Sequence, residues 1–180
     1  NIYNQSLVAS LISNIGIKET EEWAKGFVKN FARKTQGNDR SQIMAVANGE
    51  ADITIANTYY YGLMLSGTAG ADQLNAAKKV KMLFPNQDNR GTHVNISGSG
   101  ILKYSKNPKN AEIFLEFLLS TDVQKHIVNN TFEYPVIDKV SPSSFISQFG
   151  TTFIQDQTPA SNFGKYNSEA IKLMDRVGWK

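Results

Sequence analysis

The sequence predicts an α/β fold, because stretches with helical spacing of apolar residues alternate with short extended runs. Three helix-like stretches come first, and the strand-like run 53–55 ends just before three consecutive tyrosines at 59–61. A second strand-like run covers 80–84, and a third, 92–97, alternates polar and apolar residues with period two. With 41% hydrophobic and 19% charged residues over 180 positions, the chain has the composition of a folded globular protein.

The predicted helices of the first half have recognisable starts and ends. Residues 4–15 place apolar side chains at helical spacing, with Asn4 or Ser6 as a possible cap, and Gly16 stops the helix. The second helix starts at 20–22, and its expected apolar face consists of Trp23, Phe27, Val28 and Phe31. The third covers 41–48 and ends at Gly49, and an Ala-rich helix at 72–79 follows the loop 67–71.

The second half of the chain is predicted to be mainly helical at its two ends. Pro108 opens one apolar helix, since proline is favoured in the first turn, and Thr121 caps another. Residues 141–162 look irregular apart from one turn of helix at 144–148, and a final helix covers 167–177.

Composition narrows the classes of function. The chain has no Cys, which excludes disulfides, thiolate metal sites and iron–sulfur clusters. No run of 18 apolar residues occurs, so we expect no membrane insertion. The net charge of +3 is dispersed among acidic residues, so we expect no nucleic acid partner. A mildly positive field favours an anionic ligand or an anion-bound metal.

The consecutive tyrosines are the strongest functional signal. A deprotonated phenol is a hard, anionic oxygen donor that suits a hard, highly charged cation. Free tyrosine titrates near pH ~10, so a phenolate at neutral pH needs a strong positive charge beside it, which a trivalent metal supplies. Tyr59 and Tyr60 are therefore candidate metal ligands, and the alternative is an aromatic patch that caps a core.

Other candidate site residues carry weaker signals. Asn4, Gln5 and Ser6 open a predicted helix directly after Tyr3, which is the setting of an anion site, although an ordinary helix cap is the alternative. His93 and His126 have no metal-ligand spacing, so we expect them to be structural or solvent-facing. No dinucleotide loop, Walker loop or nucleophile elbow occurs, so an enzyme is not expected.

Five stretches form a specific set that spans almost the whole chain. They are Asn1-Ile2-Tyr3-Asn4-Gln5-Ser6-Leu7, Asn57-Thr58-Tyr59-Tyr60, Phe84-Pro85-Asn86-Gln87, the run from Arg90 to Gly98, and the run from Ala170 to Trp179. Together they closely resemble the ferric-iron-binding periplasmic proteins of bacterial ABC importers, in particular the tyrosine-rich branch found in cyanobacteria and some proteobacteria.

The resemblance implies a set of iron ligands. Two consecutive tyrosines and a third one upstream bind Fe³⁺ in that family, which carries over to Tyr59, Tyr60 and Tyr3. Tyr61 has no counterpart, and we expect it to pack or to support the ligands. The family's remaining ligands lie in an N-terminal segment that this sequence lacks. A synergistic anion such as carbonate is a further candidate for the iron shell.

The resemblance also implies the architecture, which is the C-terminal portion of a two-lobed clamp with a class II periplasmic binding protein-like fold. Residues 1–89 would form the first part of the C-terminal lobe, 90–139 the crossover and part of the N-terminal lobe, and 140–180 the return. The chain opens without Met, and we expect a fragment or processed piece of a protein that is a monomer when full length. The helices at 108–130 would then expose apolar faces.

The sequence thus predicts a periplasmic solute-binding protein that binds Fe³⁺ and delivers it to an ABC transporter permease. A binding protein of the same fold for a small oxyanion or organic anion is the alternative, with the tyrosines as a stacking or hydrogen-bonding wall. A phosphoryl- or acyl-transfer enzyme is a more distant third reading.

Overall fold

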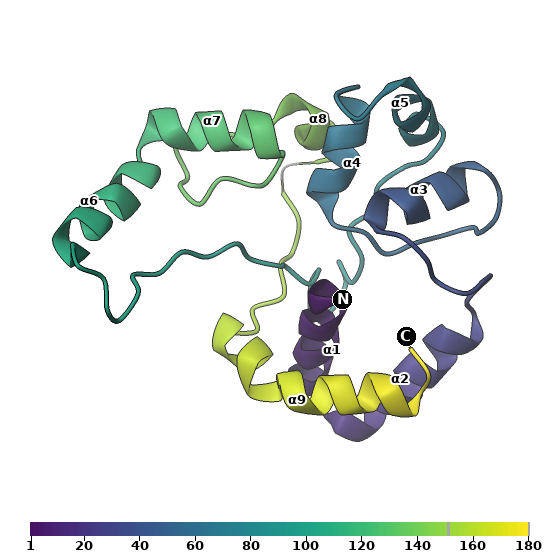
Figure 1. Cartoon of the computed structure of the whole chain (residues 1–180). Helices are drawn as coiled ribbons and strands as arrows, with labels where there is room; N and C mark the ends of the chain where they lie inside the picture. Colours follow the sequence, from purple (N-terminus) through teal and green to yellow (C-terminus); the bar gives the residue numbers. More distant parts are fainter. Residues whose placement is uncertain (151, 180) are drawn as a thin grey trace. The chain divides into compact units, whose positions relative to one another are not determined.

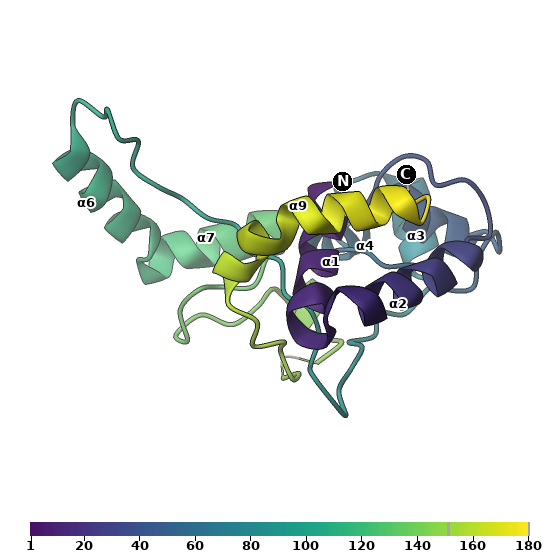
Figure 2. The same ribbon diagram turned by 90° about the horizontal axis from the view of Figure 1, so that it is seen from below.

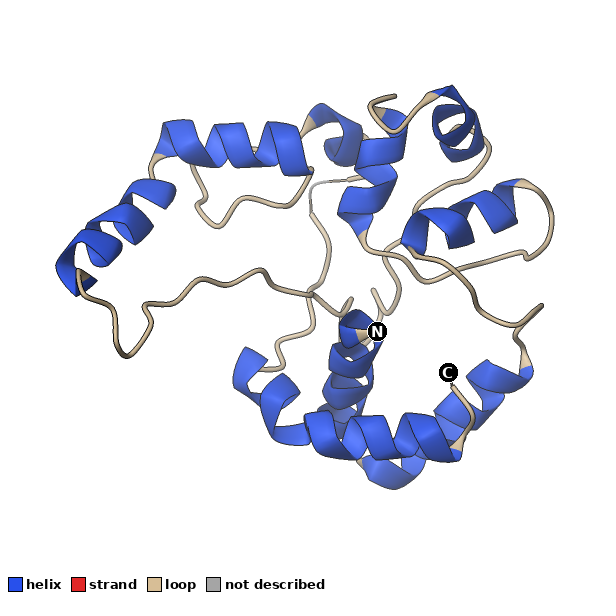
Figure 3. Ribbon diagram, viewed as in Figure 1, coloured by secondary structure: helices blue, strands red, loops and turns tan. Residues whose placement is uncertain are grey.

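The computed structural model describes residues 1–150 and 152–179, and that part of the chain contains nine α-helices (Figures 1 and 3). They are α1 Ile2–Ile15, α2 Ile17–Lys29, α3 Asp39–Ala47, α4 Thr58–Leu65, α5 Ala71–Ala77, α6 Pro108–Leu118, α7 Thr121–Thr131, α8 Ser144–Ser147 and α9 Ala160–Arg176. The chain divides into two compact units. The first unit comprises 1–36, 84–96 and 153–180, and the second comprises 37–83 and 97–152.

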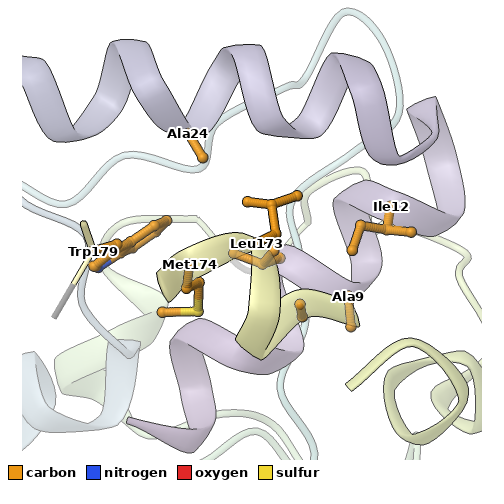
Figure 4. Packing of buried hydrophobic residues seen from close by; sticks show 8 residues of the cluster. Ala9, Ile12, Ala24, Leu173, Met174 and Trp179 are labelled. Atoms are coloured by element: carbon orange, nitrogen blue, oxygen red, sulfur yellow. The ribbon is translucent and has the colours of Figure 1, made fainter. Parts of the chain in front are cut away.

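In the first unit, α1 packs against α2 and α9 (Figures 1 and 2). The buried side chains of its core are shown in Figure 4. They are Val8, Ala9, Ile12, Ala24, Ala170, Leu173, Met174 and Trp179. The predicted apolar face of α2 packs against this core, and Trp23 stacks on Phe27 with ring centroids 5.2 Å apart. Burying such aromatic side chains contributes much of the stability of a small unit.

A buried carboxylate joins three segments of the first unit. The Asp156 side chain is only 3% exposed and forms an ion pair with Arg90, with 3.0 Å between Oδ2 and Nη1. Ser10 and Asn14 of α1 also donate hydrogen bonds to this carboxylate. The backbone N–H of Asp156 donates to the carbonyl of Thr92 at 2.8 Å. The carboxylate therefore holds the turn at 90 and the segment before α9 against α1.

Acidification should destabilise the first unit through Asp156. Burial raises the pKa of this carboxyl, but hydrogen bonds from Ser10, Thr158 and Asn14 outweigh that effect, and the net pKa is below the ordinary value of 3.8. A depressed folded-state pKa stabilises the fold above the ordinary value, and the stabilisation is lost as pH falls through the folded-state pKa. We expect Asp156→Asn to be less stable than the wild type at pH ~7 and the difference to shrink below pH ~4.

Urea unfolding of both proteins at neutral and acidic pH measures this difference. Asp175→Asn, on the exposed surface of α9, is the matched control and should leave the pH dependence unchanged. An Asp156→Asn protein with the same acid sensitivity as the wild type would contradict the assignment.

In the second unit, α4 lies at the centre of the packing, in contact with α3, α5 and α8. Its core consists of Ile43, Tyr61, Met64, Ala76 and Ala77. Gly62 of α4 packs closely, because an added Cβ there would lie 2.8 Å from Cβ of Phe132, the residue that caps α7. The second unit therefore fixes α4 on several sides.

The strands expected at 53–55, 80–84 and 92–97 are not formed. Figure 3 shows extended loop there, and within 1–150 and 152–179 the β pairing is one parallel bridge between Thr92 and Gln155. Ile53 is 82% exposed and Leu83 is 81% exposed. A strand is stabilised by its neighbours in a sheet, so a β-favouring sequence without a paired segment stays extended but unpaired.

Most predicted helices are confirmed, with corrections at their starts. The cap of α1 is Asn1, whose side chain accepts a hydrogen bond from the Tyr3 amide, and not Asn4 or Ser6. The final helix begins at Ala160 and not at 167. The three tyrosines lie inside α4, and the run before them at 53–55 is not a strand. Helix starts depend on a few capping contacts, which explains why the starts differ more than the helices themselves.

The expected exposure of apolar faces holds for α6. This helix has no buried residue, and Ile113, Phe114 and Phe117 are each more than half exposed. The neighbouring α7 differs because it buries Gln124 and Val128. An exposed apolar helix face of this kind indicates a surface that another polypeptide segment covers.

The chain passes between the two units at several points. One of them lies between residues 96 and 97, within the segment expected to be the crossover between lobes. The assignment of 1–89, 90–139 and 140–180 to lobes stays a prediction, because the units are defined by contacts within this chain alone.

Candidate metal centre

The start of α4 presents the tyrosine pair. Asn57 is the N-cap, so Tyr59 and Tyr60 are the second and third residues of the helix. Side chains on a helix tilt towards its N-terminus, and these two therefore extend towards the open end of α4. Negative charge is favoured at this end because the backbone N–H groups and the helix dipole are positive there.

The two phenol rings lie together. Their centroids are 4.3 Å apart and their planes are tilted by 41°. Both residues are half-buried, so the rings are supported by the protein while part of each stays accessible. A single helical turn can thus offer two phenolic oxygens to one bound cation.

Tyr61 belongs to the core and not to the pair. It is 5% exposed, and its hydroxyl donates to the carbonyl of Ala77 or Val80, with oxygen–oxygen distances of 3.2 and 2.9 Å. Burial raises the pKa of the Tyr61 hydroxyl, which favours the protonated form. The expectation that Tyr61 packs is confirmed.

Tyr3 and residues 4–6 lie on α1, in the first unit. The Gln5 amide donates to the Asn1 carbonyl at 3.2 Å, so it takes part in the helix. The Ser6 hydroxyl lies within hydrogen-bonding distance of the Tyr3 carbonyl and of the Asn95 side chain. The structure thus places Tyr3 and Ser6 near one another, whereas Tyr59 and Tyr60 belong to the second unit.

The two histidines have different surroundings. His93 packs edge-on against Phe163, and its Nε2 lies 3.4 Å from the Ser6 hydroxyl. Burial lowers the pKa of His93, so its neutral form is favoured. His126 is exposed on α7. Both positions agree with the structural or solvent-facing roles expected from the sequence.

Within the described residues, no group of three or more His, Asp or Glu side chains could hold a metal ion.

The sequence pattern does not reveal the side chain that supports the start of the tyrosine-bearing helix. Asp39, the first residue of α3, accepts hydrogen bonds at one oxygen from the backbone and side-chain nitrogens of Asn57, at 2.7 and 2.8 Å. The signal for a helix start was present, because Asn is a favoured N-cap and directly precedes Thr58. Nothing in the sequence pattern links it to a residue 18 positions earlier.

Comparisons with known proteins identify the family of this chain. The family model described as "Bacterial extracellular solute-binding protein" matches residues 5–151. The chain is 48% identical over its whole length to iron uptake protein A1 of Synechocystis and spans 49% of that protein. The chain therefore covers about half the length of the curated relatives it matches.

Solved structures of iron-binding proteins are also similar to this chain. A Trichodesmium protein in complex with iron and citrate is 52% identical, with a TM-score of 0.95 over 100% of this chain and 56% of that one. The ferric binding protein from Campylobacter jejuni is 41% identical, with a TM-score of 0.92 over 98% of this chain and 55% of that one. None of the helices in 1–150 or 152–179 is long and apolar enough to cross a membrane. The chain belongs to the family of bacterial extracellular solute-binding proteins.

Proposed function

We propose that the protein containing this chain binds Fe³⁺ in the periplasm and delivers it to the permease of an ABC transporter. The observation that carries the proposal is the Tyr59–Tyr60 pair at the start of α4, whose rings lie 4.3 Å apart. Relatives of this chain are named iron uptake protein and ferric iron-binding protein, which supports the same function. The protein binds and releases its cargo without catalysing a reaction.

Tyr3 is the third proposed phenolate ligand. It lies near the start of α1 in the first unit, and the Fe³⁺ ligand set that we propose is Tyr3, Tyr59 and Tyr60. We propose that the full-length clamp closes on its cargo by hinge motion, because a ligand favours the state in which it gains more contacts. The remaining coordination positions would be filled by ligands from the rest of the full-length protein.

The rest of the full-length protein would also form the second part of the two-lobed fold. The exposed face of α6 and the unpaired extended segments at 53–55 and 80–84 support this, because each presents apolar side chains without a covering layer. We propose that this missing lobe segment covers α6 and that the completed clamp, in its class II periplasmic binding protein-like fold, is a monomer.

In the proposed site, a synergistic anion such as carbonate is a further ligand of the iron. We assign the binding of this anion to Asn4, Gln5 and Ser6, which share the first two turns of α1 with Tyr3. The Trichodesmium relative was solved with citrate as well as iron, which favours a carboxylate or carbonate as partner. The same observation supports the alternative function, the binding of a small organic anion alone.

Adding Fe³⁺ to the full-length protein tests the proposal. Phenolate coordination should produce a visible charge-transfer band, which acid should bleach because protons compete with the metal for the phenolate oxygens. Citrate or carbonate without iron serves as the control for the alternative. Tight binding of the anion alone, with no band on addition of Fe³⁺, would show that the iron assignment is wrong.

A further inference from the structure

The tyrosine pair depends on how α4 begins. Residues 50–55, which lead up to it, are mostly exposed, and Ile53 is 82% exposed. Ala56 packs against the core of this unit, but the exposed segment before it adds little that could fix the first turn of α4. A further anchor for this turn comes from another part of the unit.

Asp39 supplies that anchor. Its Oδ2 accepts from the backbone N–H of Asn57 at 2.7 Å and from the Asn57 side-chain amide at 2.8 Å. Two hydrogen bonds to one carboxylate oxygen fix both the position and the orientation of the N-cap. Tyr59 and Tyr60 follow within the same turn, so any displacement of the cap moves both phenols.

Asp39 is itself held in place. The Asn38 side chain accepts from the Ser41 amide at 3.2 Å, and the Ser41 hydroxyl lies 3.4 Å from the Asn38 amide, which forms a capping box at the start of α3. Ile43 of the same helix is buried in the core that also contains Tyr61 of α4. The carboxylate is therefore fixed to the same packed core as the C-terminal part of α4.

We infer that Asp39 is a positioning residue for metal binding, because it sets the direction in which Tyr59 and Tyr60 present their oxygens. The inference rests on the proposed function. Asp39 acts through Asn57 and is not itself assigned as a ligand. It follows that loss of the carboxylate should change the coordination of bound iron and not only the stability of the fold.

The test compares Asp39→Ala, Asp39→Asn and Asp72→Ala in the full-length protein. Asp39→Ala removes both hydrogen bonds, and we expect Fe³⁺ affinity to fall about tenfold or more, with a weaker or shifted charge-transfer band at saturating iron. Asp39→Asn keeps an acceptor oxygen, so its affinity should stay within about threefold of the wild type. Asp72 is exposed and also lies in the first turn of a helix of this unit, so Asp72→Ala should match the wild type.

Affinity is measured by competition with a chelator, and thermal unfolding is recorded for every variant. An Asp39→Ala protein that is less stable but keeps the wild-type band and affinity would overturn the inference, as would equal losses in Asp39→Asn and Asp39→Ala. If Asp39→Ala does not fold, Asn57→Ala provides the same test, because it removes one of the two hydrogen bonds. A wild-type protein without a band would refute the proposed function itself, which is a separate outcome.

Discussion

Replacing either Tyr59 or Tyr60 by phenylalanine should sharply reduce the Fe³⁺ affinity of the full-length protein. Phenylalanine keeps the packing of the ring but removes the donor oxygen. Loss of a supporting partner of a metal ligand typically costs about 10- to 100-fold in affinity, so loss of a direct ligand should exceed that range. Competition with a chelator, together with the intensity of the charge-transfer band, measures the effect.

Tyr61→Phe is the matched control for both changes. It removes a hydroxyl from the adjacent residue of the same helix, but that hydroxyl points into the core and donates to the carbonyl of Ala77 or Val80. We expect unchanged iron affinity and a loss of about 1 kcal/mol in stability, the usual net contribution of such a hydrogen bond. Equal effects of Tyr59→Phe and Tyr61→Phe on iron affinity would contradict the assignment of the pair.

Gly91→Ala should be the most damaging small substitution in the first unit. Gly91 has φ +89°, and an added Cβ would lie 2.5 Å from the carbonyl carbon of Gln155. The left-handed conformation costs an ordinary residue about 1–2 kcal/mol, and overpacking against backbone adds roughly 1–3 kcal/mol. The bridge between Thr92 and Gln155 and the contacts of Asp156 would be disturbed with it.

Gly49→Ala separates the cost of the left-handed backbone conformation from the cost of overpacking. Gly49 has φ +79°, but an added Cβ would meet nothing within 4 Å, so only the conformational cost applies. Denaturant unfolding of the two variants should therefore show a clearly larger loss for Gly91→Ala. Equal losses would mean that the close approach of the Gln155 backbone contributes nothing.

Local sequence patterns predicted the helices well. The predicted apolar positions Trp23, Phe27, Val28 and Phe31, for example, all pack on the core, although Phe31 lies just beyond the end of α2. Such positions follow from the geometry of a helix, whose hydrogen bonds are all local. The strands at 53–55, 80–84 and 92–97 were predicted from equally local patterns but did not form, because β pairing requires a partner that is distant in sequence.

The candidate site also has one part that the sequence predicted and one part that it did not. The tyrosines were identified from residue chemistry and from the resemblance of several motifs, and the family was confirmed by the comparisons. Their support was not identifiable, because the hydrogen bonds from Asn57 to Asp39 connect residues that no periodicity relates.

The sequence by itself determined most of the helical segments, which tyrosines are chemically suited to a hard cation, and to which family the chain belongs. The tertiary structure decided that the tyrosines lie in the first turns of a helix, and that Tyr61 faces the core while the rings of Tyr59 and Tyr60 lie together. It also decided that the carboxylates of Asp39 and Asp156 each join segments that are distant in the sequence. The physical reason is that helix periodicity and donor chemistry are properties of neighbouring residues. The direction of a side chain and the partners of a buried carboxylate are set by long-range packing.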